Sequence, residues 1–259
     1  MGIVNVTPDS FSDGGRHAST QAAIVHARRL ISEGVDILDV GGESTRPGAA
    51  MVGEQEELDR VLPVIEGLRD MPIPISIDTY KPSVMRAALA AGASMVNDVN
   101  ALQSEGAIDA VLGGDAAVCL MHKQGSPDTM QQRPVYQNVM AEVGGFLRER
   151  ITALEVAGVA RERIIIDPGF GFGKTIEHNL ELLRNLDALN AFGVPILAGL
   201  SRKSMLGAIT GRDVDDRLVA SVAAAMMAVQ RGASIVRVHD VRETIDALKI
   251  LQAVKEERR

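Results

Sequence analysis

Short apolar runs that end in a polar residue recur along the chain. Each run is followed by a loop rich in glycine or proline and then by a segment with helical periodicity. Eight strands are predicted, over Gly2–Val6, Asp36–Val40, Ile73–Thr79, Ser94–Val99, Ala116–His122, Arg163–Asp167, Pro195–Leu200 and Ser234–His239. Eight helices are predicted, over Thr20–Glu33, Glu54–Arg69, Lys81–Ala91, Ser104–Leu112, Gln137–Ala157, Ile176–Asn190, Asp215–Arg231 and Val241–Glu257.

Glycines support several of these helix ends. Gly34, Gly92, Gly158, Gly193 and Gly232 each fall just past a predicted helix, where a left-handed residue commonly ends it. Eight βα units in 259 residues fit a (β/α)₈ TIM barrel in the α/β class. A doubly wound open sheet is the alternative.

Polar residues at the strand ends favour the barrel. They are Asn5, Asp39, Asp78, Asn97, Asp167 and His239, and each lies at or near the carboxyl end of an apolar run. One such residue alone is most simply a cap for the following helix. Six together indicate an active site, because the carboxyl ends of all strands of a barrel meet at one mouth.

The segment Asp167–Thr175 resembles a phosphate-binding loop but matches neither common motif. A Walker A loop requires glycine six residues before Lys174, where the chain has Pro168, and a dinucleotide fingerprint starting at Gly169 requires glycine at Lys174. What is left is a flexible strand-to-helix loop with an aspartate at its root. Its glycines allow the backbone to approach a flat ligand closely.

Composition excludes several classes of function. Lys and Arg number 27 against 34 Asp and Glu, so the net charge of −7 gives no support to a broad nucleic-acid or anionic-membrane surface. Cys119 is the one cysteine, and no second Cys or His lies near His122, which argues against a disulfide and a zinc site. The most apolar stretch, Leu218–Gln230, has 13 residues and is too short to cross a bilayer. No basic-then-apolar leader opens the chain, so we expect a cytoplasmic protein.

Cationic residues follow the last two predicted strands. Arg202, Lys203, Arg237 and His239 are expected near the edge of the mouth where barrels often bind phosphate, which indicates an anionic substrate. Arg237 and His239 alternate along one strand, so both are expected to point inward. The other histidines, His17, His26 and His178, are expected to be solvated.

Seven segments resemble the dihydropteroate synthase family and occur in that family's order. They are Asn5–Gly15, Gly42–Gly48, Ser76–Thr79, Asn97–Asp98, Asp167–Lys174, Ser201–Ser204 and Arg237–Asp240. The resemblance implies a single TIM-barrel domain over residues 1–259. It implies an enzyme of folate biosynthesis that joins p-aminobenzoate to 6-hydroxymethyl-7,8-dihydropterin pyrophosphate, giving 7,8-dihydropteroate and pyrophosphate. The short segment that usually precedes the family's first strand is expected to be absent, since the chain opens at Met1.

The resemblance also implies roles for individual residues. The expected catalytic residues are Asp78, Asp167, Lys203, Arg237 and His239. The expected pterin and pyrophosphate site holds these five with Thr45, Asn97 and Val238, and the expected p-aminobenzoate site holds Thr45, Arg46, Pro47, Phe172 and Ser204. Mg²⁺ is the expected cofactor, with Asn5 as its side-chain ligand. The expected partners are the small-molecule substrates and a second copy of the chain, through Leu218–Gln230, with no nucleic acid and no membrane.

The implied chemistry agrees with these residue types. Carboxylates and an amide can pair with the amide-and-amino edge of a pterin, and positive charge stabilises a departing pyrophosphate. The attacking amine is an aniline, neutral at pH 7, so its attack needs no general base.

Two alternatives remain open. A methyltetrahydrofolate–corrinoid methyltransferase also binds pterins in a barrel, but it has no pyrophosphate to bind. That reading leaves Arg237–His239, Ser201–Lys203 and the Ser44–Gly48 loop unexplained. A non-catalytic pterin-binding paralogue is expected to have lost pyrophosphate-site or magnesium-site residues, and none is missing from the sequence.

Overall fold

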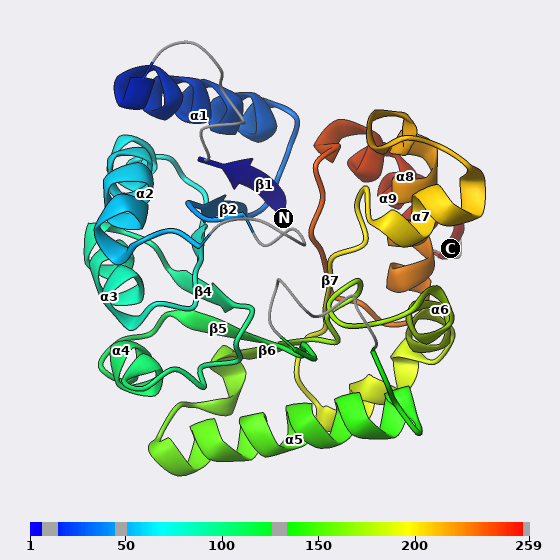
Figure 1. The fold of residues 1–259 in the computed structure, drawn as a ribbon. Coiled ribbons are helices and arrows are strands. Elements are labelled where there is room, and N and C mark those ends of the chain that lie inside the picture. Colours follow the sequence, from blue (N-terminus) through cyan, green and yellow to red (C-terminus); the bar gives the residue numbers. More distant parts are fainter. Residues whose placement is uncertain (7–14, 45–50, 126–133, 256–259) are drawn as a thin grey trace.

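The computed structural model describes residues 1–6, 15–44, 51–125 and 134–255. Helices form an outer ring around parallel strands (Figure 1). The strands are β1 (Gly2–Asn5), β2 (Leu38–Gly41), β3 (Ile75–Asp78), β4 (Met95–Asp98), β5 (Ala117–Met121), β6 (Ile164–Asp167), β7 (Leu197–Ala198) and β8 (Ile235–Val236). The α-helices are α1 (Gly15–Ser32), α2 (Glu54–Leu68), α3 (Pro82–Ala91), α4 (Ala107–Leu112), α5 (Val139–Ala157), α6 (Ile176–Arg184), α7 (Ser204–Thr210), α8 (Leu218–Gln230) and α9 (Val241–Lys255).

The strands close into a barrel. β1 to β6 are hydrogen-bonded in chain order, and β7 pairs with β8. Parallel bridges between Ile166 and Ile196 and between Gly2 and Val238 join the two groups at both edges. The Val238 N–H donates to the Met1 carbonyl at 3.0 Å, and the Val238 carbonyl accepts from the Ile3 N–H at 3.1 Å. The predicted (β/α)₈ barrel is therefore confirmed, and the open doubly wound sheet is wrong.

The glycine signals at the helix ends are confirmed. All five expected glycines have left-handed backbones, with φ between 65° at Gly193 and 119° at Gly92. The N–H groups of Gly92 and Gly158 donate to carbonyls of the last turns of α3 and α5. These helices end where the sequence supplies a residue that tolerates positive φ.

The predicted helix boundaries differ from the structure in two main places. The stretch predicted as one helix over Ile176–Asn190 divides, because α6 ends at Arg184 and a 3₁₀ helix, η3 (Leu186–Phe192), follows Asn185. The short helix α7 was not predicted as an element of its own. It has seven residues and is followed by Gly211, which has φ of 68°. So short a helix contains too few turns for a helical pattern of apolar residues to be recognised.

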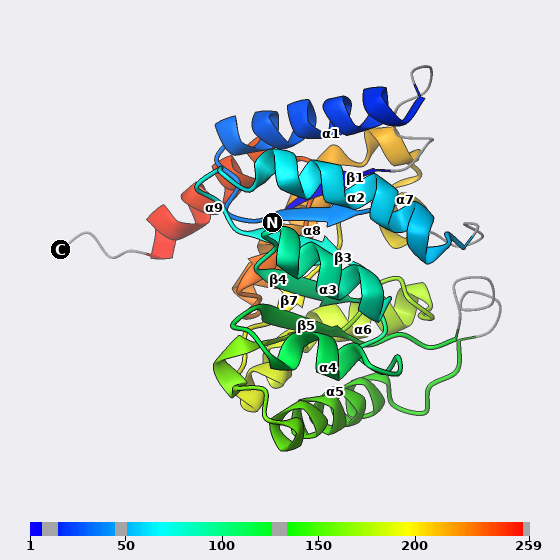
Figure 2. The ribbon, with the colours of Figure 1, turned by 90° about the vertical axis from the view of Figure 1, so that its left-hand side faces the viewer.

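The two ends of the barrel differ in character. Its interior near the amino ends of the strands is an apolar layer formed by Met1, Met95, Cys119, Ile165 and Leu197. Beside this layer, between β8 and α9, lies a cavity of about 600 Å³, lined mainly by apolar side chains. In Figure 2, α9 extends from the barrel on the left, the side of these amino ends.

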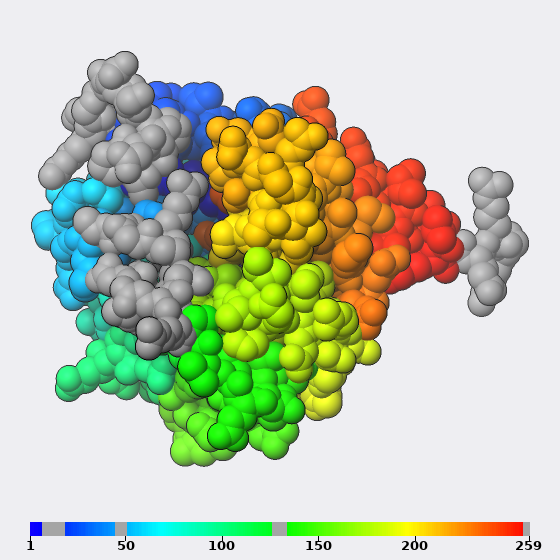
Figure 3. All heavy atoms as spheres, turned by 45° about the vertical axis from the view of Figure 1, so that its right-hand side comes forward, coloured from blue at the N-terminus to red at the C-terminus, as the bar shows by residue number. Residues whose placement is uncertain are grey.

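The helices that follow β6 and β7 form one face of the molecule. On this face, α7 and α8 lie between α6 and α9 (Figure 3). The α8 side chains of Val219 and Met227 are 79% and 54% exposed. Among the described residues, no helix combines the length and apolar character needed to cross a membrane.

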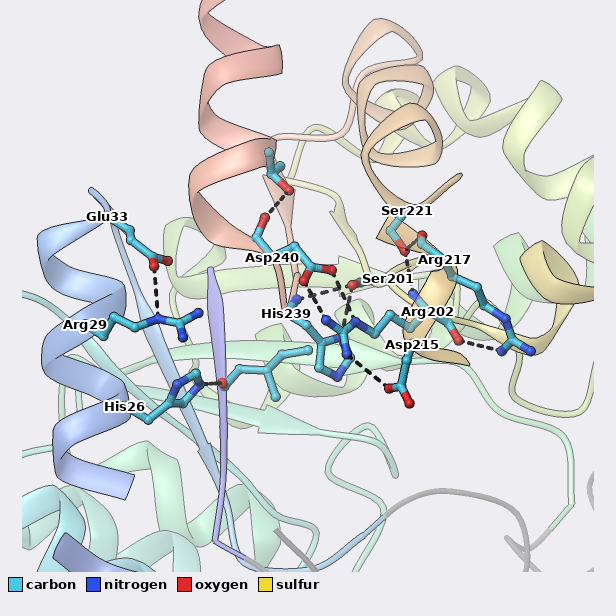
Figure 4. Close-up of polar contacts among 12 residues, drawn as sticks. His26, Arg29, Glu33, Ser201, Arg202, Asp215, Arg217, Ser221, His239 and Asp240 are labelled. Carbon is cyan, nitrogen blue, oxygen red and sulfur yellow. Dashed lines mark hydrogen bonds and ion pairs between the residues drawn. The ribbon is translucent and has the colours of Figure 1, made fainter. Parts of the chain in front are cut away.

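Two of the histidines expected to be solvated make defined contacts. The His26 Nε2 atom lies 3.2 Å from the carbonyl oxygen of Ile3 in β1 (Figure 4). His178 completes a reciprocal cap with Thr175 at the start of α6 and packs edge-on against Tyr136. The expectation was wrong for both, because each pairs with a residue outside its own helix.

Candidate active site

Arg237 is the centre of a polar network at the mouth of the barrel. Its Nε atom lies 2.6 Å from Oδ2 of Asp39, and its Nη2 atom lies 2.7 Å from Oδ2 of Asp78. Asn97 donates from Nδ2 to the same Asp39 oxygen at 3.2 Å. Strand-end side chains from β2, β3, β4 and the end of β8 thus meet at one point, as the strand-end pattern predicts.

The charges of this network keep Arg237 ionised, and one nitrogen of its guanidinium has no hydrogen bond among the described residues. Burial raises the pKa of Asp78 to about 7, against the opposing charge of Arg237. Burial alone would lower the pKa of Arg237, but Asp39 and Asp78 outweigh it and the net shift is upward. Arg237 therefore stays charged, and its Nη1 atom makes no hydrogen bond within the described part of the chain.

Asp167 and Lys203 form a second group, at the ends of β6 and β7. The Gly169 N–H donates to Oδ1 of Asp167 at 2.7 Å, which leaves Oδ2 as an acceptor. Burial raises the pKa of Asp167 to about 6, although the Gly169 hydrogen bond and the Lys203 charge oppose the shift. Burial lowers the pKa of Lys203 to about 8, with the charge of Asp167 opposing.

The Lys203 ammonium lies over an aromatic ring. Its Nζ atom is 4.1 Å from the centroid of Phe172, a cation–π contact. In residues 1–6, 15–44, 51–125 and 134–255 it has no hydrogen bond or ion pair. Gly171 permits the approach, because a Cβ atom there would lie 3.1 Å from Cδ of Lys203. The mouth therefore presents a half-buried cation whose ammonium has donors without a partner among the described residues.

Ser201 orients His239. The Ser201 Oγ atom accepts from the His239 backbone N–H at 3.2 Å and lies 2.9 Å from its Nδ1 atom (Figure 4). The Ser201 hydroxyl therefore fixes both the backbone and the ring of His239, which lies two residues after Arg237. This supports the expectation that the histidine is held at the mouth.

Arg202 is held in a left-handed backbone conformation, with φ of 58°. Its N–H donates to Ser221 Oγ at 2.9 Å, and its carbonyl accepts from Arg217 Nη1 at 3.1 Å (Figure 4). Its guanidinium makes a two-point contact with Asp240, at 2.6 Å and 3.2 Å. Asp240 therefore pairs with Arg202 in the described structure, and a role of Arg202 toward an anion stays a prediction.

Other predicted residues have mixed outcomes. The Val238 side chain lines the cavity between β8 and α9, and both its backbone groups pair with β1, so the structure does not bring it to the mouth. Ser204 is exposed at the first residue of α7. Thr45, Arg46 and Pro47 lie outside the described residues.

Asn5 is the expected magnesium ligand. It ends β1, is half-buried and has no hydrogen-bond partner for its side chain in the described structure. No cluster of three or more His, Cys, Asp or Glu residues that could hold a metal is present among the described residues. A lone amide oxygen suits Mg²⁺ when phosphate oxygens and water complete the octahedron, which is how this ion is often held. The donor set fits an ion that arrives with a diphosphate.

Sequence reasoning counted Asp39 among the strand-end polar residues without giving it a role of its own, and it gave none to Lys174. Asp39 is fully buried and receives both Arg237 and Asn97. Its signal was a charged residue within the apolar run of β2. Lys174 is 97% buried, as its 3% relative exposure shows, and its signal was a lysine ending a glycine-rich loop.

Comparison with known proteins identifies close relatives. Residues 1–239 match the family described as pterin binding enzyme. The dihydropteroate synthase of Escherichia coli strain K12 is 49% identical over 254 residues, which cover 98% of this chain and 90% of that protein. The solved structure of Xanthomonas albilineans dihydropteroate synthase with 4-aminobenzoic acid has a TM-score of 0.94 and 55% identity, covering 99% of this chain and 93% of that one. The complex of the same enzyme with 7,8-dihydropteroate has a TM-score of 0.91 and 52% identity, with the same coverage.

Proposed function

Because the chain belongs to the pterin-binding enzyme family, we propose that it acts as a dihydropteroate synthase in folate biosynthesis. It joins 6-hydroxymethyl-7,8-dihydropterin pyrophosphate to p-aminobenzoate and releases 7,8-dihydropteroate and pyrophosphate. The observation that carries the proposal is a set of polar atoms at the mouth that have no partner among the described residues, above all Asp167 Oδ2, Lys203 Nζ and Arg237 Nη1. They offer one acceptor and two charged donors from three different strand ends, so the set indicates a polar ligand.

The pterin is held by Asp78, Asn97, Asp167 and Lys203. A pterin edge presents ring N–H and amino donors beside carbonyl and ring-nitrogen acceptors. Asp167 Oδ2 accepts from the donors, and Lys203 donates to an acceptor. Loss of any such pair leaves a buried group unsatisfied, which is why polar pockets discriminate strongly among ligands.

The diphosphate is held by Arg237 and His239. In the reaction, the bond between the pterin methylene carbon and the diphosphate oxygen breaks, and a bond from that carbon to the aniline nitrogen forms. The leaving oxygen keeps the electron pair, so the cation at Arg237 stabilises the departing group. The carboxylates of Asp78 and Asp167 favour positive character at the pterin, and the aniline nitrogen then loses its proton.

The p-aminobenzoate is bound by Thr45, Arg46 and Pro47 with Phe172 and Ser204. The Phe172 ring, already beneath Lys203, offers an apolar contact for the flat aromatic substrate. A relative 55% identical to this chain binds 4-aminobenzoic acid, which supports this assignment.

Asn5 is the residue that would hold Mg²⁺ at the site. When bound, the ion supplies positive charge to the diphosphate oxygens. We further propose that the chain is one domain and that two copies associate through α8, whose Val219 and Met227 side chains are exposed. A cytoplasmic location stays a prediction.

One assay tests the function and separates the alternatives. We expect the protein to release pyrophosphate from the pterin substrate only when p-aminobenzoate is present. Binding of the pterin without this release would indicate a non-catalytic paralogue. Methyl transfer from methyltetrahydrofolate to a corrinoid, again without pyrophosphate release, would indicate the methyltransferase.

A further inference from the structure

Lys174 is a buried lysine that none of the proposed steps uses. Its Nζ atom lies 2.9 Å from the Gly169 carbonyl, 3.1 Å from the Phe172 carbonyl and 3.0 Å from Nδ1 of His122. The His122 carbonyl is a fourth neighbour, at 3.4 Å. The Lys174 amino group, whose pKa burial lowers to about 7, has no ion-pair partner within hydrogen-bonding distance in the described chain. Its hydrogens are therefore directed to acceptors that belong to one loop and to the end of β5.

His122 is suited to accept one of these hydrogens. Burial and, to a smaller extent, the charge of Lys174 together lower the pKa of His122 to about 3. The ring is therefore neutral and offers the Nδ1 lone pair. It is also fixed in place, since it packs edge-on against Phe146 with centroids 5.1 Å apart.

The loop around the Lys174 amino group contacts both Asp167 and Lys203 at the mouth. At its start, the Gly169 N–H donates to Asp167. Near its end, the Phe172 ring lies beneath Lys203. Lys174 binds the backbone carbonyls of both Gly169 and Phe172, so a single ammonium fixes both ends.

The sequence of the Gly169–Gly173 loop does not by itself fix the backbone conformation seen here. Gly169, Gly171 and Gly173 have φ values of 70°, 79° and 61°, in the left-handed region that glycine enters freely but does not prefer. A Cβ atom at Gly169 would lie 1.8 Å from the His122 carbonyl oxygen, so the backbones touch there. Three glycines make this approach possible and also make the loop pliable, so an external contact must select its shape.

We propose that Lys174 is a positioning residue for this reaction: its enclosed ammonium holds the Gly169–Gly173 loop in the shape that places the Phe172 ring beneath Lys203. The proposal rests on the proposed function. Its consequence falls on p-aminobenzoate, because Phe172 is the loop residue assigned to that substrate. The pterin groups Asp78 and Asn97 come from other strands and keep their places. Asp167 and Lys203 lie outside the loop and contact it only through the Gly169 N–H and the Phe172 ring, so the effect on the pterin is smaller.

The test compares Lys174→Met with Lys249→Met as the matched control. Methionine keeps an unbranched apolar stem and removes the donors, and Lys249 is 72% exposed. In Lys174→Met we expect the KM for p-aminobenzoate to rise at least tenfold, while kcat and the KM for the pterin substrate change less than threefold. Amide hydrogen exchange, followed by mass spectrometry, should accelerate at least tenfold in the peptide containing Gly169–Gly173 and not in the strands. Lys249→Met should match the wild type in every measure.

A second variant covers the case in which Lys174→Met does not fold. The Tyr136 hydroxyl donates to the Gly173 carbonyl at 2.9 Å, so Tyr136→Phe removes a different hydrogen bond from the same loop. We expect faster exchange in the same peptide and a KM for p-aminobenzoate raised about threefold. A folded Lys174→Met with unchanged exchange and KM overturns the proposal, as does an unchanged Tyr136→Phe when Lys174→Met fails to fold. A wild-type protein without p-aminobenzoate-dependent pyrophosphate release overturns the function and Lys174's part in it, whereas the exchange data separately decide whether Lys174 holds the loop.

Discussion

The two ends of the barrel differ because one is filled by apolar side chains and the other carries polar groups. At the amino ends of the strands, Met95, Cys119 and Ile165 fill the interior, and the neighbouring cavity of about 600 Å³ is lined mainly by apolar side chains. At the carboxyl ends, the buried Asp167 and the half-buried Lys203 keep polar atoms that no described residue pairs with. Unpaired polar atoms, rather than the size of a hollow, therefore indicate where the ligand binds.

Removal of Arg237 should have the largest effect. Arg237→Met leaves Asp39 and Asp78 buried together without their cation, so we expect stability to fall by about 3 kcal/mol or more. Affinity for the pterin pyrophosphate should fall at least tenfold more than affinity for the pterin alcohol, because only the ester carries the charge. Denaturant unfolding and calorimetry measure the two effects, and Arg242→Met is the exposed control. If affinity fell equally for the ester and the alcohol, Arg237 would not be part of the diphosphate site.

Loss of the Asp167 carboxylate should cost pterin binding. In Asp167→Ala the ring N–H groups have no acceptor, so we expect affinity for the pterin to fall by about 1–3 kcal/mol, roughly fivefold to more than a hundredfold. Calorimetric titration with the pterin pyrophosphate measures it. A variant that stays folded and binds as tightly as the wild type would contradict the pterin assignment.

The raised pKa of Asp167 also predicts how stability depends on pH. Its pKa moves from 3.8 to about 6, mainly because burial disfavours the charged form. Between these values the folded state binds more protons than the unfolded state, so its contribution to stability is present below about pH 4 and is lost as pH rises through 6. Relative to the wild type, Asp167→Asn should therefore become more stable by on the order of 2 kcal/mol between pH 4 and pH 7. Unfolding free energies at the two pH values check this, and a constant difference would mean that the carboxyl titrates normally.

A change at the opposite end should act on stability alone. Val241 is 2% exposed and lines the cavity between β8 and α9. Val241→Ala enlarges that hollow, so we expect a loss of about 1 kcal/mol of stability and no change in substrate affinity. A change in pterin affinity of more than twofold would contradict the claim that this end of the barrel affects stability and not binding.

The sequence predicts the barrel and its mouth because both arise from local patterns. Strand-end residues such as Asp78 and Asp167 stand out against apolar runs, and glycines such as Gly92 end helices by backbone geometry alone. These signals span a few residues, so they can be read without knowing which elements meet. The single-domain prediction over 1–259 stays a prediction.

Pairings between distant segments could not be predicted in the same way. Asp39 and Arg237 are 198 positions apart, and only closure of the barrel brings them together. The pairing of Arg202 with Asp240 could not be predicted for the same reason, since the two residues belong to different loops. Val238 was placed at the mouth with its neighbours, although alternation along a strand turns its side chain away from theirs.

A crystal structure of the protein with a bound dihydropterin tests the central claim most directly. The account predicts the pterin at the carboxyl ends of the strands, with its donor edge on Asp167 Oδ2 and an acceptor on Lys203 Nζ. The apolar cavity beside α9 should contain no pterin. A pterin bound in that cavity, or at the mouth without contact to Asp167 and Lys203, would contradict the account.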